Sequence, residues 1–397
     1  MQRFEHVLVI CPEFGVMPDG SYKASGLAQF ARCVFRTLAS SNNVGNLTGW
    51  GLLDSEDAAQ WFRTRYLANV VRARDVELRG FAGNRLRMGL SFLTTHQRYD
   101  MVMFLHTGVA RLSFLRPRGR SSVWLVGVDV RRPLGWRERF AIKKADPLLS
   151  ISTFSSEEMR RYNPALPSAK TVHLCAEPDD PWLEGDRSGR SPPPYSAAER
   201  VRAVLIVARQ ARSHRYKGHE QLIGGWSEVL AKVPDAELWI AGSGNDHVRL
   251  CALATAAGHT ESKVRFFGNV SHERLLELYS TARVFAMPST GEGFGLVFVE
   301  AMRFGLPCIC SRDAAAEIVV HEKTGLVVDQ NASAIAAACV RLLSDCDAAD
   351  RMATCGRLRY EREFTFDAMR ARLFRALDLN VGAVDATRKY SYDVSQP

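Results

Sequence analysis

The chain has 397 residues, of which 46% are hydrophobic and 24% charged, and a formal net charge of +9. This length exceeds one ordinary hydrophobic core, so two globular domains are expected. No apolar run approaches the ~20 residues that a membrane-spanning helix requires, which excludes such a helix. The nine cysteines form no Cys-x-x-Cys pair and the N-terminus does not resemble a signal peptide, so we expect a cytoplasmic protein.

The positive charge is concentrated in the N-terminal half. Residues 60–144 contain eighteen Lys and Arg against five Asp and Glu, a net of +13, which leaves about −4 for the rest of the chain. This asymmetry indicates an anionic partner, such as an anionic membrane surface, a phosphorylated acceptor or a nucleic acid. No nucleic-acid motif is present, so nucleic acid is not expected. The alternative is a solvated basic face that keeps the protein soluble.

Strand and helix patterns alternate along the N-terminal half. Short apolar runs separated by amphipathic helices predict a parallel sheet covered on both faces. The predicted strands are residues 6–10, 100–105, 121–128, 148–152 and 171–175, and the predicted helices are 25–38 and 136–145.

Residues 184–200 have neither periodicity nor apolar residues to bury, which is typical of a linker or surface insertion. The alternation then restarts, with predicted strands at 203–207, 237–241, 263–267, 284–287, 308–310 and 326–328 and helical sequence from 345 to about 379. We therefore predict an α/β protein of two doubly wound, Rossmann-like domains. Their predicted bounds are 1–183 and 201–375, with the linker at 184–200 and a helix end and tail at 376–397.

A glycine-rich stretch, Gly291-Glu-Gly-Phe-Gly-Leu-Val-Phe-Val-Glu300, joins a predicted strand to a predicted helix. Its three glycines allow positive φ and close backbone approach, and the free N–H groups of the new helix favour an anion. Glu292 and Glu300 frame this site, where carboxylates accept hydrogen bonds from the hydroxyls of a sugar or ribose. The alternative is an ordinary turn with two solvated glutamates.

Two cations lie upstream of this stretch. Arg209 follows the first strand of the C-terminal half, and Lys217 with Gly218 opens the next helix. Ligands of open α/β sheets bind beyond the carboxyl ends of the strands, so the pair suits a diphosphate, although both could be surface charges. Gly242-Ser-Gly244 lacks the third glycine of a dinucleotide fingerprint, which disfavours an NAD site.

The spacing Glu292-x7-Glu300 resembles the E-x7-E motif of family-4 glycosyltransferases, retaining enzymes of the GT-B fold that use nucleotide-sugar donors. The resemblance implies two domains facing a central cleft and a final helix that crosses back to the first domain. It implies that Glu292 lies against the donor sugar, that Glu300 holds the nucleotide ribose, and that the two cations bind the diphosphate. The donor-binding residues implied are Arg209, Lys217, Gly242, Glu292, Gly293, Phe294, Gly295, Leu296, Glu300 and Gly26.

The resemblance is firm over residues 203–329 and weaker in the N-terminal half. Gly26 stands where the family usually has paired glycines that reach the donor phosphates. His106 stands where family members often place a histidine near the sugar, although a capping or core role is the alternative. Asp129, Arg131 and Arg132 follow the next strand, where they could meet an acceptor or pair with one another.

These residues and the resemblance predict a retaining glycosyltransferase that moves a sugar from a nucleotide diphosphate to a lipid-linked or glycan acceptor. The catalytic residues expected are Glu292, Arg209, Lys217 and His106. No cofactor or metal is expected, because fixed cations and a helix N-terminus can stabilise the departing diphosphate. Asp345-Cys-Asp347 has the form of a metal-binding pair, but it falls in a helical run where its side chains point apart.

Alanines at 314–316, before Glu317, replace the glycines that the family usually has there, so a close backbone contact with the donor is in doubt at this point. Two alternatives to a transferase remain. A nucleotide-sugar epimerase would turn over the donor without an acceptor. A binding protein would use the basic half to dock anionic lipid or nucleic acid, and the intact set of Arg209, Lys217, Glu292 and Glu300 argues against it.

Overall fold

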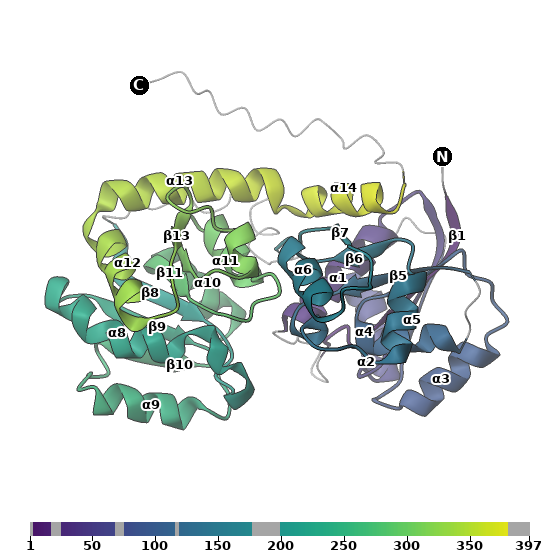
Figure 1. Cartoon of the computed structure of the whole chain (residues 1–397), viewed down its shortest axis with the longest axis horizontal. Coiled ribbons are helices and arrows are strands. Elements are labelled where there is room, and N and C mark those ends of the chain that lie inside the picture. Colours follow the sequence, from purple (N-terminus) through teal and green to yellow (C-terminus); the bar gives the residue numbers. More distant parts are fainter. Residues whose placement is uncertain (1–2, 17–24, 68–74, 116–118, 177–198, 380–397) are drawn as a thin grey trace, which may run out of the picture.

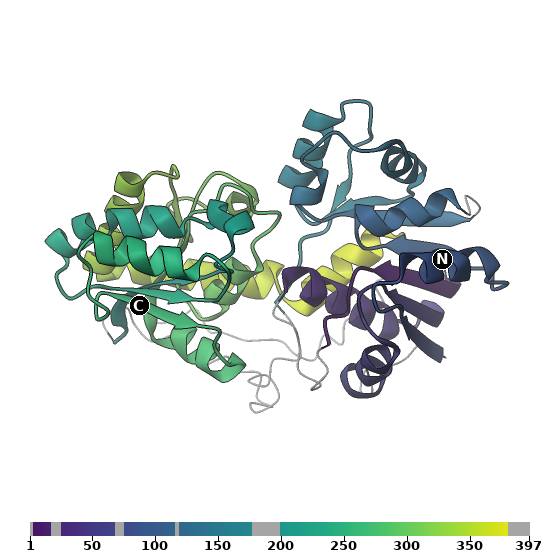
Figure 2. The same ribbon diagram turned by 90° about the horizontal axis from the view of Figure 1, so that it is seen from below.

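The computed structural model describes residues 3–16, 25–67, 75–115, 119–176 and 199–379. The chain forms two α/β lobes that lie side by side (Figure 1), and Figure 2 shows the same arrangement from below. Each lobe contains one sheet, in which every strand pairing is parallel. The predicted architecture of two doubly wound domains is confirmed.

The N-terminal sheet has the strand order β3-β2-β1-β4-β5-β6-β7. Its strands are β1 (Phe4–Cys11), β2 (Val44–Gly51), β3 (Asp75–Gly80), β4 (Met101–Phe104), β5 (Arg120–Leu125), β6 (Leu148–Ser150) and β7 (Lys170–Thr171). The helices are α1 (Gly26–Ala39), α2 (Glu56–Trp61), α3 (Arg85–Thr94), α4 (Thr107–Ala110), α5 (Trp136–Lys144) and α6 (Thr153–Tyr162), with short turns η1 (Phe62–Tyr66), η2 (Arg111–Phe114) and η3 (Val128–Val130).

The central strand β1 is buried on both faces of this sheet. Val7 and Val9 belong to one hydrophobic cluster, while Leu8 and Ile10 belong to the cluster on the opposite face. Because helices cover both faces, the strand needs apolar residues at consecutive positions rather than at alternate ones. This explains the unbroken apolar run from which the strand was predicted.

Three parts of the N-terminal lobe differ from the prediction. Strands β2 and β3 were not predicted, because β2 contains three glycines and few apolar residues. A Cβ atom on Gly49 would lie 2.4 Å from the Phe35 ring, so glycine lets α1 pack on the sheet there. The predicted strand 121–128 ends at Leu125, because Gly127 (φ 121°) turns the chain into η3. The predicted strand 171–175 contributes only Lys170–Thr171 to the sheet.

The C-terminal sheet has the order β10-β9-β8-β11-β12-β13, and each strand begins and ends within two residues of its predicted bounds. The strands are β8 (Val201–Val207), β9 (Glu237–Ala241), β10 (Val264–Gly268), β11 (Ala282–Met287), β12 (Cys308–Cys310) and β13 (Gly325–Val327). The helical elements are η4 (Arg212–Lys217), α8 (His219–Lys232), α9 (His247–Ala256), α10 (His272–Thr281), α11 (Leu296–Arg303), η5 (Ala314–Glu317), α12 (Ala332–Ser344) and α13 (Cys346–Glu363).

The last helix, α14 (Phe366–Ala376), lies against the N-terminal lobe (Figure 1). Lys170 donates to the carbonyl oxygen of Ala376 (3.3 Å), and Arg372 donates to that of His173 (3.2 Å). The chain therefore crosses between lobes near Phe364, where α13 ends, which is earlier than the predicted boundary at residue 375. The helical sequence after residue 345 is divided between the two lobes.

Cys308 and Cys310 are buried in β12, and all nine cysteines are free. Burial raises the pKa of both thiols. Within the described ranges, no helix is both long and apolar enough to cross a membrane. The predicted linker at 184–200, apart from its last two residues, and residues 380–397 of the predicted helix end and tail lie outside the described residues.

Candidate active site

A buried carboxylate, that of Asp313, holds the loop between β11 and α11 in place through hydrogen bonds. Asp313 accepts hydrogen bonds from the Ser289 hydroxyl (2.7 Å), the Glu292 N–H (2.8 Å) and the Ala315 N–H (2.9 Å). Its side chain is buried, and burial raises its pKa to about 6 although these hydrogen bonds oppose the shift. Asp313 follows β12, the neighbour of β11 in the sheet, so it reaches the loop from the adjacent strand end.

The three glycines of this loop serve different purposes. Gly295 has a φ of 96° and precedes α11, as predicted, and as a glycine it has no side chain with which to cap the first turn of that helix. Gly291 and Gly293 do not have positive φ, which corrects that part of the prediction. They permit close approach instead. A Cβ on Gly291 would lie 2.7 Å from the Tyr216 ring, and one on Gly293 would lie 2.7 Å from Cα of Gly127 in the other lobe.

Glu292 of this loop forms an ion pair with Lys217. The Lys217 ammonium lies 2.9 Å from Oε1 of Glu292 and also contacts Oε2, and only 15% and 14% of the two side chains are exposed. Sequence analysis placed Lys217 on the diphosphate and Glu292 on the sugar as separate groups. The structure brings them into direct contact, so each charge offsets the other in the absence of a ligand.

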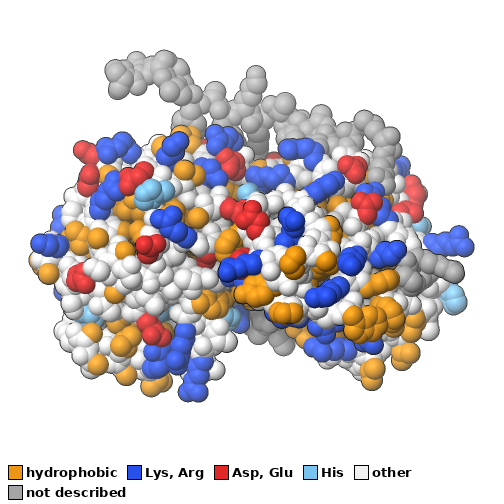
Figure 3. Space-filling model, viewed as in Figure 1, with side chains coloured by type: hydrophobic (Ala, Val, Ile, Leu, Met, Phe, Trp, Pro, Cys, Tyr) orange, Lys and Arg blue, Asp and Glu red, His pale blue; other side chains and the backbone are white. Residues whose placement is uncertain are grey.

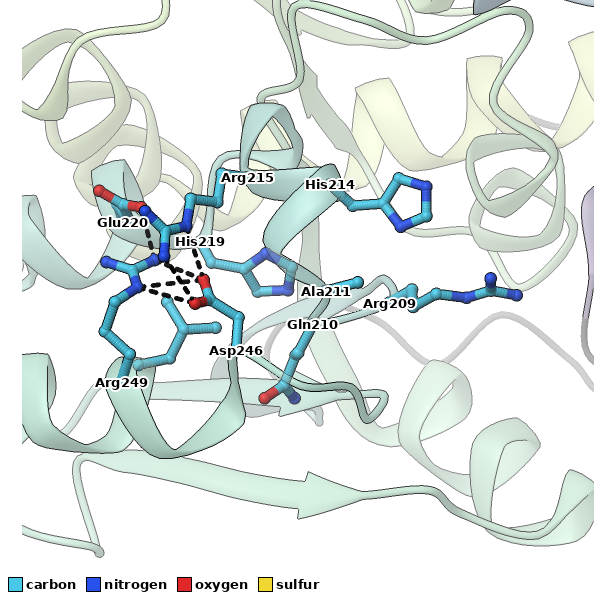
Figure 4. Close-up of a pocket in the computed structure, with 10 residues that line it drawn as sticks. Arg209, Gln210, Ala211, His214, Arg215, His219, Glu220, Asp246 and Arg249 are labelled. Carbon is cyan, nitrogen blue, oxygen red and sulfur yellow. Dashed lines mark hydrogen bonds and ion pairs between the residues drawn. The ribbon is translucent and has the colours of Figure 1, made fainter.

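Arg209 is the second cation of this site, and its side chain is exposed. It has no hydrogen bond or ion pair with any described residue. Burial, Lys217 and Arg209 all lower the pKa of His214, which places the three side chains in one electropositive region. In Figure 4 Arg209 extends away from its neighbours in the pocket. Arg209 is therefore available to an anion.

Two other arginines of this region, Arg215 and Arg249, are held in a structural network. The buried Asp246 accepts hydrogen bonds from Arg215 (2.9 and 3.1 Å) and from Arg249, and Arg249 also contacts Glu220 (2.6 Å), as Figure 4 shows. These contacts tie η4 and α8 to the start of α9. The basic character of residues 210–216 is thus partly structural.

Glu300 is the fifth residue of α11. The hydroxyl of Tyr279 donates to Oε2 of Glu300 (3.0 Å), and the Tyr279 ring stacks on Phe304 with centroids 5.7 Å apart. Burial, followed by the nearby carboxylate of Glu300, raises the pKa of Tyr279 well above its ordinary value. Tyr279 is therefore a neutral donor that fixes the direction of the Glu300 carboxylate.

The N-terminal lobe contributes a histidine–carboxylate pair. His106 caps α4, with Nδ1 accepting from the Gly108 N–H (2.8 Å) and Nε2 lying 3.6 Å from Oδ2 of Asp129. The same Asp129 oxygen accepts from the Thr107 hydroxyl (2.7 Å). Burial raises the pKa of Asp129, and His106 opposes this shift. Because Nδ1 is an acceptor here, the proton of a neutral His106 is on Nε2, facing Asp129.

Arg131 and Arg132 point in different directions. Arg131 donates to the carbonyl oxygen of Glu292 across the lobes, and its guanidinium lies 4.8 Å from the centre of the Phe154 ring. Arg132 instead binds the buried Glu138 (2.7 Å). Burial alone would raise the pKa of Glu138, but the hydrogen bonds from Arg132 and Arg111 lower it to about 2. Arg132 is thus paired with Glu138 rather than with Asp129, and a contact of these residues with an acceptor stays a prediction.

The glycine-rich loop docks on the N-terminal lobe through one carbonyl group. The carbonyl oxygen of Gly293 accepts from the hydroxyls of Ser152 (2.6 Å) and Ser155 (3.1 Å), at the start of α6. Gly127 lies against the same residue from the end of β5. The lobes therefore meet at the predicted motif itself.

Glu317 adds a second contact between the lobes. Its carboxylate accepts from the backbone N–H groups of Thr153 (2.9 Å) and Phe154 (2.5 Å), and from Nε2 of His173 (2.9 Å). Although burial opposes it, this set of hydrogen bonds lowers the pKa of Glu317. Glu317, which sequence analysis noted only beside the replaced glycines, thus caps a helix of the opposite lobe.

Two helix N-termini face each other between the lobes. Gly26 is the first residue of α1, and Leu296 is the first residue of α11. A Cβ atom on Gly26 would lie 3.7 Å from Cδ1 of Leu296. Since helix N-termini carry partial positive charge, both favour an anion at this junction. Sequence analysis assigned both residues to the donor site, and the structure brings them together.

Phe294 and Gly242 differ from the other predicted donor residues. The Phe294 ring is buried beside His173 and Phe364, with centroids 5.6 and 6.2 Å away, so only its backbone can face a ligand. A Cβ on Gly242 (φ 127°) would lie 2.1 Å from the Ala208 carbonyl oxygen. Gly242 is therefore required by packing between the turns after β8 and β9, whatever it binds.

No group of three or more His, Cys, Asp or Glu side chains in the described ranges could hold a metal ion. Asp345 caps α13 by accepting from the Ala348 N–H (2.9 Å), and Asp347 lies in the first turn of that helix.

Comparison with known proteins supplies the family. The family described as Glycosyl transferases group 1 matches residues 198–359. A GDP-mannose-dependent alpha-(1-6)-phosphatidylinositol monomannoside mannosyltransferase of Mycobacterium tuberculosis is 30% identical over 294 residues, which are 69% of this chain and 75% of that protein. The chain belongs to the glycosyl transferases group 1 family.

A second relative of this group 1 glycosyltransferase is a GDP-mannose-dependent monoacylated alpha-(1-6)-phosphatidylinositol monomannoside mannosyltransferase of Corynebacterium glutamicum. It is 28% identical over 62% of this chain and 67% of its own. Anabaena HepE, solved in complex with UDP and glucose, has a TM-score of 0.67 with 16% identity, over 94% of this chain and 99% of its own. Sucrose-phosphate synthase of Thermosynechococcus elongatus has a TM-score of 0.68 with 22% identity over the same shares. The fold is GT-B.

Sequence analysis missed several residues of this group 1 glycosyltransferase site. Asp313 and Tyr279 each hold a predicted glutamate, and Ser152 holds the glycine-rich loop. Asp313 could have been found, because it is the first carboxylate beyond the carboxyl end of the next predicted strand. Tyr279 lies inside a helix and Ser152 lies in the other lobe, and no sequence signal connects either residue to the motif.

Proposed function

We propose that this group 1 glycosyltransferase is a retaining, family-4-type enzyme that transfers a hexose from a nucleotide diphosphate sugar to a lipid-linked or glycan acceptor. The observation that carries the proposal is the arrangement at the start of α11. Its uncapped N-terminus follows Gly295, the Lys217–Glu292 ion pair lies in front of it, and Arg209 is exposed in the same electropositive region. An anion binds best where cations and free N–H groups converge.

The names of the relatives support a sugar nucleotide as the donor. Both relatives are named as GDP-mannose-dependent mannosyltransferases of a phosphatidylinositol monomannoside, and HepE was solved with UDP. GDP-mannose is therefore the first donor to test, with UDP-sugars beside it. A phosphoglycolipid is the first acceptor.

The charges of the site match the bond that the reaction breaks. Cleavage of the anomeric bond leaves positive charge on the sugar ring and negative charge on the departing diphosphate. A bound diphosphate would take Lys217 from Glu292, which leaves the Glu292 carboxylate to accept from sugar hydroxyls. Arg209 and the N–H groups of α11 are further fixed donors, and loss of one such donor typically costs about 3 kcal/mol of transition-state stabilisation.

We propose that no metal is required, because two cations and a helix N-terminus already neutralise the leaving group. The backbone of Glu292 is held at two points. Its carbonyl oxygen accepts from Arg131 of the opposite lobe, and its N–H donates to Asp313. We propose that the His106–Asp129 pair of the N-terminal lobe lies beside the sugar or the acceptor. We assign no covalent nucleophile.

The test is release of nucleoside diphosphate from GDP-mannose and from UDP-sugars, with and without a lipid extract. We expect acceptor-dependent release that persists in EDTA, and an anomeric configuration in the product that matches that of the donor by NMR. Acceptor-independent conversion of the donor to an epimer would instead indicate an epimerase. An inverted product, or activity abolished by EDTA and restored by a divalent cation, would contradict the proposed mechanism.

A further inference from the structure

Helix α3 carries two apolar stripes, and only one of them is buried. Met88 and Phe92 pack into the core of the N-terminal lobe. Leu86, Leu90 and Leu93, spaced at i, i+4 and i+7 on the other side, are 82%, 62% and 49% exposed. A helix with apolar residues on opposite faces is normally buried on both. The outer stripe of α3 therefore lacks the cover that its composition calls for.

The exposed stripe continues into two neighbouring elements. A Cβ on Gly89 of α3 would lie 3.8 Å from Leu115, at the end of η2. Phe114 contacts Trp136, the first residue of α5, with ring centroids 4.7 Å apart. These side chains are 41%, 41% and 60% exposed for Phe114, Leu115 and Trp136. We call this set the α3–α5 surface: Leu86, Leu90, Leu93, Phe114, Leu115 and Trp136.

This clustering is unusual for the described part of the chain. Six of the twelve exposed large hydrophobic side chains there belong to the α3–α5 surface, while the rest are scattered over both lobes. In Figure 3 orange side chains flanked by blue ones gather at the lower right, over the region of α3 and α5. Contiguous exposed apolar surface of this kind marks an interaction site.

The exposed charged side chains of the two helices that form this surface are all basic. Arg85 and Arg87 on α3, and Arg137, Lys143 and Lys144 on α5, are exposed, and the Arg137 guanidinium lies 5.1 Å from the centre of the Trp136 ring. Helix α3 contains no acidic residue. The only carboxylate of α5, Glu138, is buried and paired with Arg111 and Arg132. The α3–α5 surface is therefore apolar at its centre. The basic residues of α3 and α5 at its edge have no exposed acidic residue on the same two helices.

We propose that the α3–α5 surface docks this protein on an anionic lipid bilayer. Leucine and tryptophan side chains insert at the boundary between headgroups and acyl chains, and Arg and Lys bind the lipid phosphates. A second copy of this chain fits less well, because in a twofold-symmetric contact the basic residues of one copy would face those of the other. The α3–α5 surface lies within residues 60–144, the basic region of the sequence, and is the part of that region that we propose contacts the membrane.

The chain path links this surface to the candidate active site. Helix α4, which His106 caps, runs directly into η2 and Phe114, and Arg131 precedes Trp136 by five residues. A bilayer at the α3–α5 surface would hold an embedded acceptor beside the elements that carry His106 and Asp129. This placement rests on the proposed transfer to a lipid-linked acceptor, whereas binding to the bilayer itself does not.

The experiment measures sedimentation of the full chain with vesicles of phosphatidylcholine, with and without phosphatidylglycerol. We expect binding to the anionic vesicles that high salt reverses, and weak binding to the neutral ones. Leu86→Gln/Leu90→Gln/Trp136→Gln should lower partitioning onto anionic vesicles by roughly tenfold or more. Arg137→Gln/Lys143→Gln/Lys144→Gln should lower it by a similar factor and weaken its salt dependence.

Val248→Gln/Leu358→Gln is the matched control, because these side chains are 81% and 58% exposed on the other lobe, and it should bind as the wild type does. Thermal shifts with nucleoside diphosphate report whether each variant is folded. Equal partitioning of the Leu86→Gln/Leu90→Gln/Trp136→Gln variant and the wild type would overturn the proposal. So would binding to neither vesicle, or a dimer that the same substitutions dissociate. The assay contains no sugar nucleotide, so failure of the proposed transfer reaction would not affect its outcome.

Discussion

Lys217 neutralises Glu292 through an ion pair that is largely shielded from water, with its ammonium 2.9 Å from Oε1. The two residues lie 75 positions apart and come from the carboxyl ends of neighbouring strands, β8 and β11. A diphosphate that binds Lys217 must displace this contact. The pair therefore couples the place where the leaving group binds to the place where we propose that the sugar lies.

Arg209→Ala should reduce transfer about a hundredfold and leave thermal stability unchanged. The side chain is exposed and has no partner within the described residues, so its loss removes only stabilisation of the leaving group. Steady-state kinetics and thermal unfolding measure the two effects. Arg212→Ala, an exposed arginine three residues further along, is the control and should retain wild-type turnover. Wild-type turnover of Arg209→Ala would remove Arg209 from the diphosphate site.

Lys217→Ala should lose as much activity as Arg209→Ala but should also lose stability. It leaves the mostly buried Glu292 carboxylate without its ion-pair partner, which costs about 1–3 kcal/mol. Chemical denaturation measures this cost. The double variant Lys217→Ala/Glu292→Gln should recover most of the stability and none of the activity. A stable, active Lys217→Ala variant would contradict both roles.

Glu300→Ala should mainly weaken nucleotide binding, whereas Glu292→Ala should reduce turnover even at saturating donor. The ribose would lose a hydrogen-bond acceptor in the first variant, and the sugar would lose its positioning group in the second. Tyr279→Phe should weaken nucleoside diphosphate binding less than Glu300→Ala does, since it removes only the bond that orients the carboxylate. Calorimetry of nucleoside diphosphate binding and saturation kinetics distinguish these outcomes. Normal binding and turnover in both glutamate variants would reduce the motif to a turn.

Asp313 should make the fold less stable as pH rises from ~4 to ~6. Its pKa is about 6 in the folded protein and near the ordinary value of 3.8 when unfolded, so the folded state binds more protons between these values. The free energy of unfolding should therefore fall by about 2–3 kcal/mol across this range and level off above it. The signal is the difference between the wild type and Asp313→Asn, which does not titrate there. A difference that stays constant with pH would refute the shift.

Gly293→Ala should reduce transfer at least about tenfold by separating the lobes. The new Cβ at position 293 would lie 2.7 Å from Cα of Gly127 in the opposite lobe. The clash is with backbone, which cannot move aside by changing rotamer as a side chain can. Gly224→Ala is the matched control, because its Cβ would meet only Ala332 at 4.0 Å, and a helical alanine stabilises by up to about 1 kcal/mol. Full activity in Gly293→Ala would show that the loop does not need its contact with Gly127.

The sequence by itself determined the two parallel sheets and the strand end where the candidate site lies. Consecutive apolar residues in β1 and β8 require cover on both faces, which is a local property that periodicity records. The glycines before α11 and Arg209 after β8 follow predicted strands. Their positions in the sequence therefore identify the carboxyl edge of the C-terminal sheet. Strand β2 escaped prediction because its glycines make room for Phe35, a contact that no local pattern contains.

Only the tertiary structure decided which of these residues meet. The pairing of Lys217 with Glu292 depends on β8 and β11 being neighbours in the sheet, and the contact of Arg131 with the motif depends on how the lobes dock. Sequence spacing encodes neither. The sequence of α3 contains both apolar stripes equally. Which stripe faces the core is set by packing against the rest of the lobe, so the exposed stripe and its basic border became visible only in three dimensions.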